Sequence, residues 1–136
     1  MIVSKIEHIG IAVRNLQEAG KFYEQILGLE CYREETVKDQ KVRTAFYMAG
    51  NLKIELLEPT SQDSPIAKFI EKRGEGIHHI AFETKDLPKV LDKLDNKQIR
   101  LIDRHPRLGA EGLQIAFLHP ASTHGVLLEL CEACRK

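Results

Sequence analysis

Cysteine is scarce in this sequence. The chain holds only three, Cys31, Cys131 and Cys134, and no secretory segment precedes them. An odd count without such a segment argues against a disulfide framework and favours a reducing compartment. The spacing of Cys131 and Cys134 is formally C-x-x-C, but two cysteines alone cannot complete a four-ligand zinc site. A strand-end thiol followed by a tail thiol is the favoured interpretation over a redox or zinc motif.

Long hydrophobic runs and net charge are also missing. No apolar run approaches the roughly 20 residues of a membrane span, and the first residues lack a signal-peptide core. The 136 residues carry 20 basic and 20 acidic side chains, so the formal net charge is zero. This balance gives no signature of a nucleic-acid binder. We expect a cytoplasmic protein with no membrane and no nucleic-acid partner, folded as a single domain over residues 1–136.

The chain contains an internal repeat. Two segments align at an offset of 71 residues, so that residue 6 corresponds to residue 77. Each segment contains a His-Ile pair at the same position. The order and near-constant offset of the matches indicate two copies of one module, whereas no single match would. The matching segments are 6–16 with 77–87, 45–46 with 116–117, and, at an offset of 74, 54–56 with 128–130.

Each copy has the pattern of a β-α-β-β-β module. The first is predicted over about 4–59 and the second over about 76–132, with a connector helix over 64–73. Side chains suited to helix N-caps precede the helical stretches, namely Asn15, Ser64 and Asp86. Strands are predicted near 5–13, 29–36, 42–49 and 52–58 in the first copy, and near 77–84, 99–103, 113–118 and 125–131 in the second.

Strand alternation places four titratable side chains at equivalent positions. Successive side chains of a strand point to opposite faces, so His8 and Glu55 face away from the helix-packed side of the first module. His79 and Glu129 do the same in the second. A small residue stands two positions after each histidine and would leave room for a ligand. If the modules pair about a pseudo-twofold axis, the four side chains converge on one cleft.

Two imidazoles and two carboxylates suit a divalent transition metal, and the oxygen ligands favour an octahedral ion with open positions. The two glutamates would balance the charge of the cation. For any single residue, an ordinary solvated role is the better interpretation. The fourfold pattern at repeat-related positions favours the metal site.

Other polar residues have less specific contexts. His78 is predicted on the opposite face from His79, at the rim of the site, and His119 is a candidate for the rim of the cleft. The segment that carries Arg104 and Arg107 either meets phosphate or carboxylate groups of a ligand or is a solvated basic turn. Both interpretations stay open, and no glycine-rich phosphate-binding motif accompanies them.

Six segments together carry a recognisable pattern, namely 8–13, 53–59, 63–69, 74–83, 116–120 and 125–132. They resemble methylmalonyl-CoA epimerases of the vicinal oxygen chelate superfamily, which also contains glyoxalase I, extradiol dioxygenases and bleomycin- and fosfomycin-resistance proteins. The resemblance covers nearly the whole chain. It implies an α+β fold in which two tandem βαβββ modules form a cupped mixed sheet with helices on the outside. It also implies a homodimer and one divalent metal ion per chain, cobalt (Co2+) ahead of Mn2+, Ni2+ or Zn2+.

The resemblance also assigns roles to residues. Metal ligands of the family fall on His8, Glu55, His79 and Glu129, with Gln in some members at the position of Glu55. Some epimerases carry an acid/base glutamate where this chain has Thr44, whose hydroxyl cannot act as a general base. The remaining candidates for contacts with an acyl-CoA thioester substrate are Thr44, Arg107, Gly109, Ala110 and His119.

The activity implied is epimerisation of (R)- and (S)-methylmalonyl-CoA. The C2 proton would be abstracted and returned through a metal-stabilised enolate, with Glu129 and Glu55 as the two proton carriers. A glyoxalase I-type lactoylglutathione lyase, which isomerises a hemithioacetal, would use the same ligand set. Against it, residues 123–129 lack the Asp-Pro-x-Gly turn usual before the last ligand strand of glyoxalases. A non-catalytic, metal-dependent small-molecule binding or resistance protein ranks third, because a paired acid/base set would be superfluous there.

Overall fold

The computed structural model describes residues 2–133. Two compact units make up the chain: a first unit of His8–His78, and a second unit of the described residues up to Glu7 together with those from His79 onward. The strands β1 (Val3–Ala12) and β5 (Gly76–Thr84) each pass from one unit into the other. The units therefore differ from the two sequence repeats, because the first residues of the chain belong with the second repeat.

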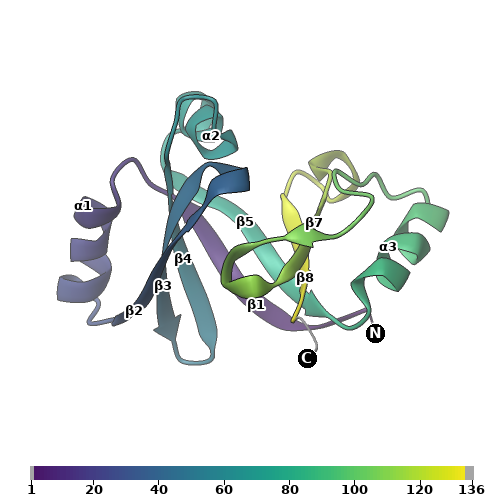
Figure 1. The fold of residues 1–136 in the computed structure, drawn as a ribbon, viewed down its shortest axis with the longest axis horizontal. Coiled ribbons are helices and arrows are strands. Elements are labelled where there is room, and N and C mark those ends of the chain that lie inside the picture. The colour runs from purple at the N-terminus through teal and green to yellow at the C-terminus, as the bar shows by residue number, and fades with distance from the viewer. Residues whose placement is uncertain (1, 134–136) are drawn as a thin grey trace. The chain divides into compact units, whose positions relative to one another are not determined.

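The first unit is a β-α-β-β-β module followed by a connector helix. Its strands lie in the order β2-β3-β4-β1, with β2, β3 and β4 antiparallel and β1 parallel to β4. A π-helical turn, Phe22–Ile26, extends the first helix. The further elements are α1 (Leu16–Lys21), β2 (Cys31–Val37), β3 (Val42–Ala49), β4 (Leu52–Pro59) and α2 (Pro65–Arg73) (Figure 1).

Each face of the first unit's sheet packs against a helix. Leu56 and Leu57 are successive residues of β4, so their side chains point to opposite faces. Leu56 packs with Leu16 of α1, whereas Leu57 packs with Ile66 of α2. The face that carries Leu57 also carries Glu55, so α2 covers one end of the face on which the predicted ligands lie.

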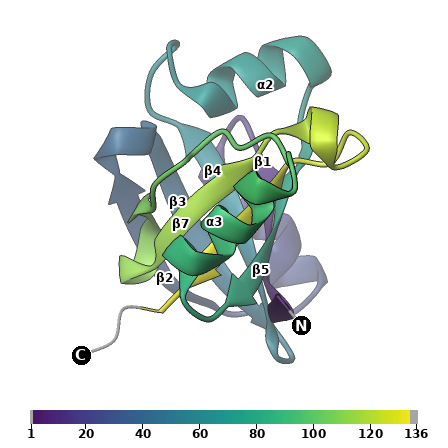
Figure 2. The ribbon, with the colours of Figure 1, turned by 90° about the vertical axis from the view of Figure 1, so that its right-hand side faces the viewer.

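The second unit repeats this plan with a shorter edge. Its strands lie in the order β5-β8-β7-β6, with β5 parallel to β8 and the rest antiparallel. The helix α3 packs through Leu87 and Leu91 onto Leu130 of β8, and Figure 2 shows it in front of β7. The remaining elements are α3 (Leu87–Asn96), β6 (Arg107–Leu108), β7 (Gln114–Leu118) and β8 (Leu128–Glu132).

The predicted α+β class with two βαβββ modules and mixed strand pairing is confirmed. The three predicted N-caps are also confirmed. Their side chains accept hydrogen bonds from the backbone N–H two or three residues on, at 2.9 Å for Asn15, 3.1 Å for Ser64 and 3.4 Å for Asp86. No helix of residues 2–133 is long and apolar enough to cross a membrane.

The predicted strand near 99–103 is wrong. Leu101 forms only an isolated bridge with Leu118. Beyond it, the N–H groups of Ile102 and Asp103 both donate to the carbonyl oxygen of Phe117, at 2.9 and 3.2 Å. The Asp103 carboxylate then accepts the N–H of Phe117 at 2.8 Å. A side chain has taken the place of a backbone acceptor, so the ladder stops, and the edge strand is instead β6.

Candidate active site

The first half-site is the pair His8 and Glu55. In the parallel register of β1 and β4, Gly10 lies beside Glu55, and His8 precedes that glycine by two residues on the same face. His8 Nε2 lies 3.4 Å from Glu55 Oε2, and both side chains are almost completely buried, at 3% and 5% exposure. The two side chains that strand alternation placed on one face of the first module therefore lie next to each other within the first unit.

The second half-site repeats the first residue for residue. Ala81 lies beside Glu129 in the register of β5 and β8, and His79 precedes that alanine by two residues. His79 Nε2 lies 3.6 Å from Glu129 Oε1, with side-chain exposures of 6% and 5%. A small residue beside the glutamate leaves the space that the histidine ring and the carboxylate share.

An aromatic ring accompanies each carboxylate. Phe46 of β3 stands opposite Glu55, and Phe117 of β7 stands opposite Glu129. The Phe117 ring meets His79 edge-on, with 5.5 Å between ring centroids. These rings help to exclude water, and a buried carboxylate without water requires a partner that donates a hydrogen bond or carries positive charge.

The nitrogen and oxygen atoms of the two half-sites are of the types that bind a divalent transition metal. Each half-site offers one imidazole nitrogen and one carboxylate oxygen, which are ligand types that such ions accept. The side chains are held on central strands and are buried, so little conformational freedom is lost when they bind an ion.

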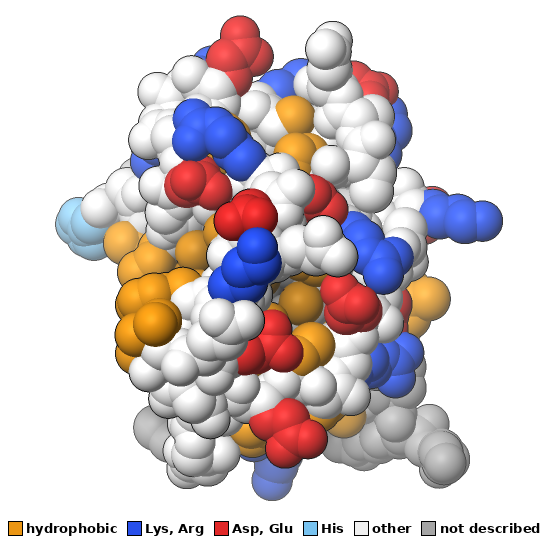
Figure 3. All heavy atoms as spheres, turned by 90° about the vertical axis from the view of Figure 1, so that its left-hand side faces the viewer, with side chains coloured by type: hydrophobic (Ala, Val, Ile, Leu, Met, Phe, Trp, Pro, Cys, Tyr) orange, Lys and Arg blue, Asp and Glu red, His pale blue; other side chains and the backbone are white. Residues whose placement is uncertain are grey.

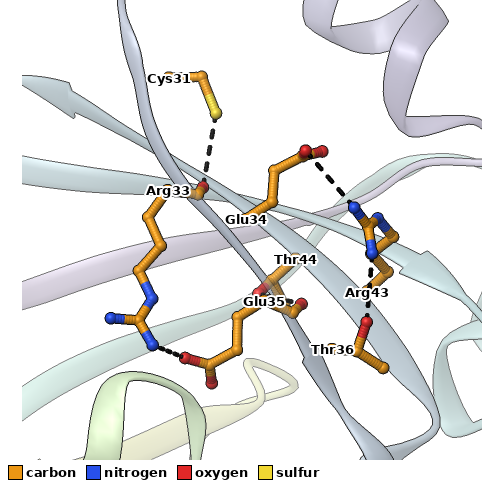
Figure 4. A network of polar contacts seen from close by, with 7 residues as sticks. All are labelled: Cys31, Arg33, Glu34, Glu35, Thr36, Arg43 and Thr44. Carbon is orange, nitrogen blue, oxygen red and sulfur yellow. Dashed lines mark hydrogen bonds and ion pairs between the residues drawn. The ribbon is translucent and has the colours of Figure 1, made fainter.

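Thr44 lies on the same strand face as Glu55. It is 1% exposed and pairs with Leu57 across β3 and β4. Its hydroxyl donates to the carbonyl oxygen of Glu35 at 3.1 Å (Figure 4). The hydroxyl therefore ties β3 to the edge strand β2, and its oxygen still has acceptor capacity.

The two arginines of the basic segment have different surroundings. Arg104 turns to α3, where its Nη2 lies 2.6 Å from Asp92 and its Nε lies 3.6 Å from Asp95. Arg107 instead lies in β6 opposite Ile115, on the strand face that carries Phe117 and therefore Glu129. Of the two, Arg107 is the one on the half-site face.

Gly109 and Ala110 form the turn between β6 and β7. The N–H of Gly109 donates to the carbonyl oxygen of Leu113 at 2.8 Å. A Cβ atom at Gly109 would come within 2.8 Å of the Ile115 side chain, so the close approach of the two strands requires glycine. Ala110 begins a short 3-10 turn, Ala110–Gly112.

His119 and His78 have structural contacts that the sequence did not indicate. His119 Nδ1 accepts the N–H of Ala121 at 3.0 Å and so caps the turn Pro120–Ser122. The His78 ring stands edge-on to Phe69 of α2 with 5.0 Å between centroids. Burial lowers the pKa of His78 to about 4, so this ring is neutral at pH 7 and adds no charge beside His79.

Cys131 is buried in β8, and its thiol donates to the carbonyl oxygen of Phe82 at 3.5 Å. This agrees with the strand-end thiol predicted for it. The companion Cys134 lies outside the described residues.

The outer face that carries α1 has a mixed surface. Acidic and basic side chains are interspersed on it (Figure 3). The π-helical turn and the residue that follows it expose three hydrophobic side chains, Phe22 at 51%, Ile26 at 71% and Leu27 at 53%. This face carries no single-sign patch in the part that is visible.

Comparison with known proteins identifies the class. A family model described as the glyoxalase/bleomycin resistance protein/dioxygenase superfamily matches residues 7–117. The uncharacterized protein YqjC of Bacillus subtilis is 50% identical over 96% of this chain and 93% of its own length. The ethylmalonyl-CoA/methylmalonyl-CoA epimerase of Cereibacter sphaeroides is 37% identical over 95% of this chain and 98% of its own length. A solved methylmalonyl-CoA epimerase in complex with methylmalonyl-CoA and NH4+ has a TM-score of 0.93 at 38% identity, covering 97% of this chain and 96% of that one.

The fold and the family model thus define a protein of the glyoxalase/bleomycin resistance/dioxygenase superfamily. Within it, the chain belongs to the methylmalonyl-CoA epimerase family. The family that the sequence resembled is confirmed, and so is the prediction of an enzyme of the epimerase class.

Proposed function

We propose that this protein interconverts (R)- and (S)-methylmalonyl-CoA by removing and returning the proton at C2. The observation that carries the proposal is the repetition of one buried His–Glu pair in both units. Relatives of similar length are named for the same reaction, and one solved relative holds methylmalonyl-CoA.

We also propose that His8, Glu55, His79 and Glu129 together hold one divalent ion. Support comes from the donor types, from the burial of all four side chains and from family membership. Cobalt is the first candidate, ahead of manganese, nickel and zinc. When bound, such a cation stabilises the negative charge that develops on the thioester oxygen as the C2 proton leaves.

Glu129 and Glu55 are proposed as the two proton carriers. Inversion at C2 requires that the proton leaves from one face and returns to the other, so two groups are needed. One carboxylate takes the proton, the C–H electron pair moves into the thioester group, and the other carboxyl returns a proton to the opposite face. The two glutamates come from different modules, and Thr44 cannot replace either as a base.

Further substrate contacts are proposed at the edge of each half-site. Thr44 shares its strand face with Glu55, and Arg107 shares its face with Glu129. The turn residues Gly109 and Ala110 and the cap residue His119 complete the proposed set. Family resemblance further supports a homodimer, and the cysteine usage supports a cytoplasmic location.

The test is proton exchange at C2. Purified protein is incubated with methylmalonyl-CoA in deuterated water, and deuterium at C2 and the ratio of epimers are followed. Turnover of this thioester, with none of a methylglyoxal–glutathione hemithioacetal, supports the proposal. Turnover of the hemithioacetal alone would replace it with the lyase, and binding without turnover of either would replace it with a binding protein.

A further inference from the structure

We propose that Arg107 holds an anionic oxygen group of the acyl-CoA substrate and that Asp103 is a positioning residue that fixes Arg107 for this task. The group is a carboxylate or a phosphate, since both present oxygens that match the planar guanidinium fork. The inference rests on the proposed function and assigns part of the substrate to one edge of the second unit.

Asp103 holds Arg107 from one side only. The Asp103 carboxylate accepts the N–H of Phe117 at 2.8 Å through Oδ2, and its Oδ1 lies 3.2 Å from Arg107 Nε. One carboxylate thus ties the arginine to the backbone of β7. Its side chain is 17% exposed, so it is anchored in the protein rather than in solvent.

The rest of the Arg107 guanidinium is held over an aromatic ring and keeps its two terminal nitrogens for a ligand. Its carbon lies 5.5 Å from the centre of the Phe117 ring, a distance typical of a cation–π contact. Within residues 2–133, Arg107 Nη1 and Nη2 make no ion pair or hydrogen bond, and the side chain is 42% exposed. An Arg that is stacked, held at Nε and open at both terminal nitrogens is pre-organised for two parallel hydrogen bonds to an anion.

Two arginines at the edge of the first unit do not share this arrangement. At the edge of the first unit, Arg33 uses Nη2 for Glu35 at 2.5 Å, and Arg43 uses Nη2 for Glu34 at 3.5 Å (Figure 4). Each of these arginines thus has its Nη2 engaged by a glutamate of the same edge, and Arg43 Nη1 also donates to Thr36 Oγ1 at 3.3 Å. The equivalent edges of the two units differ in the feature that anion recognition needs.

Arg107 is also connected to the half-site through direct contacts. The Phe117 ring beneath it meets His79 edge-on at 5.5 Å, and His79 lies 3.6 Å from Glu129. The turn that follows β6 depends on Gly109, whose missing side chain lets the chain approach Ile115 closely. An anion bound at Arg107 is therefore held at the edge of the same sheet in which β8 presents Glu129.

The first experiment compares two matched variants, R107M and R104M. Each removes one positive charge from the same segment, but Arg104 faces α3. We expect R107M to raise KM for methylmalonyl-CoA by about 10- to 100-fold, the loss of charge-assisted hydrogen bonds, with kcat within about twofold. R104M should leave both values near wild type. An unchanged KM in R107M, or equal losses in both variants, would overturn the inference.

A truncated substrate identifies the anion, and a variant of Asp103 tests its positioning role. With methylmalonyl-pantetheine, which lacks the phosphates, a persisting R107M effect assigns the carboxylate, and a vanished effect assigns a phosphate. D103N should raise KM in the wild-type background but not in R107M, because a residue acting through Arg107 has nothing left to position. A D103N effect that simply adds to R107M would overturn the positioning role. Thermal unfolding of each variant controls for loss of fold.

Dissociation constants of the CoA thioester, measured by calorimetry, separate this inference from the proposed function. A wild-type protein that turns over the substrate while R107M binds it equally well contradicts only the role of Arg107. A wild-type protein that neither turns over nor binds methylmalonyl-CoA overturns both.

Discussion

The sheet of the first unit ends in the seven-residue strand β2, whereas the sheet of the second ends in the two-residue strand β6. Inside these edges the units match: Gly10 lies beside Glu55 as Ala81 lies beside Glu129. The central strands share one His–Glu geometry, whereas the edge strands differ in length. The two units therefore agree where the His–Glu pairs lie and differ at the edges of their sheets.

A second feature repeats outside the site. Glu58 and Glu132 each follow the half-site glutamate by three residues and so point to the opposite strand face. Glu132 accepts the N–H of Leu87 at 2.8 Å, and Glu58 accepts that of Leu16 at 3.4 Å. In each unit, one strand supplies two carboxylates. The first is buried in the half-site, and the second caps the helix on the opposite face of the sheet.

The first prediction asks whether the half-sites hold one ion or two. We expect metal analysis to give about one divalent ion per chain, and chelation to abolish epimerisation until the ion is restored. The variants H8A and H79A should each lose the ion, because both half-sites contribute to it. Two ions per chain, or an H8A variant that keeps a full ion at His79, would show that the pairs bind independently. H124N, which changes an exposed turn histidine, serves as control.

The second prediction asks whether the half-sites are equal in proton transfer. E129Q and E55Q should each lower epimerisation by about 10²- to 10⁴-fold, the usual contribution of a positioned acid or base. With separate epimers in deuterated water, each variant should still exchange the C2 proton of one epimer without inverting it. The same epimer exchanging in both variants, or wild-type inversion in either, would contradict the two-carrier mechanism. E58Q removes a carboxylate from the opposite face of the same strand and should leave turnover unchanged.

Much of this arrangement was predictable from the sequence, because it depends on local periodicity. The alternation of β1 and β4 and the repeat placed His8 and Glu55 on one face, and the structure brings them to 3.4 Å. The edge of the second unit was not predictable, because the Asp103 side chain replaces a backbone acceptor in the ladder. Such a substitution depends on tertiary contacts and leaves no periodic signal. The helix caps from Glu58 and Glu132 were missed for the same reason.

The third prediction compares the cores of the two units. Leu56 and Leu91 are both fully buried, one against α1 and one within α3. L56A and L91A should each lower the free energy of unfolding by about 2–5 kcal/mol, measured by denaturant titration. Hydrogen exchange should accelerate most in the unit that carries the change. Equal acceleration throughout both units would show that they unfold as one. L27A, at an exposed position, should cost less than about 0.5 kcal/mol.

The smallest predicted effect separates the two carboxylate caps. Glu132 accepts two N–H groups, from Asp86 at 2.5 Å and Leu87 at 2.8 Å, whereas Glu58 accepts one at the long distance of 3.4 Å. E132Q should therefore cost about 1 kcal/mol of unfolding free energy, and E58Q only a few tenths. Both variants keep the shape of the side chain, and E132Q keeps one acceptor oxygen. The difference in unfolding free energy between the two variants therefore reports the charge and the second hydrogen bond of Glu132. If E58Q cost as much as E132Q, the caps would be equivalent despite their geometry, and the divergence between the units would be confined to the edges of their sheets.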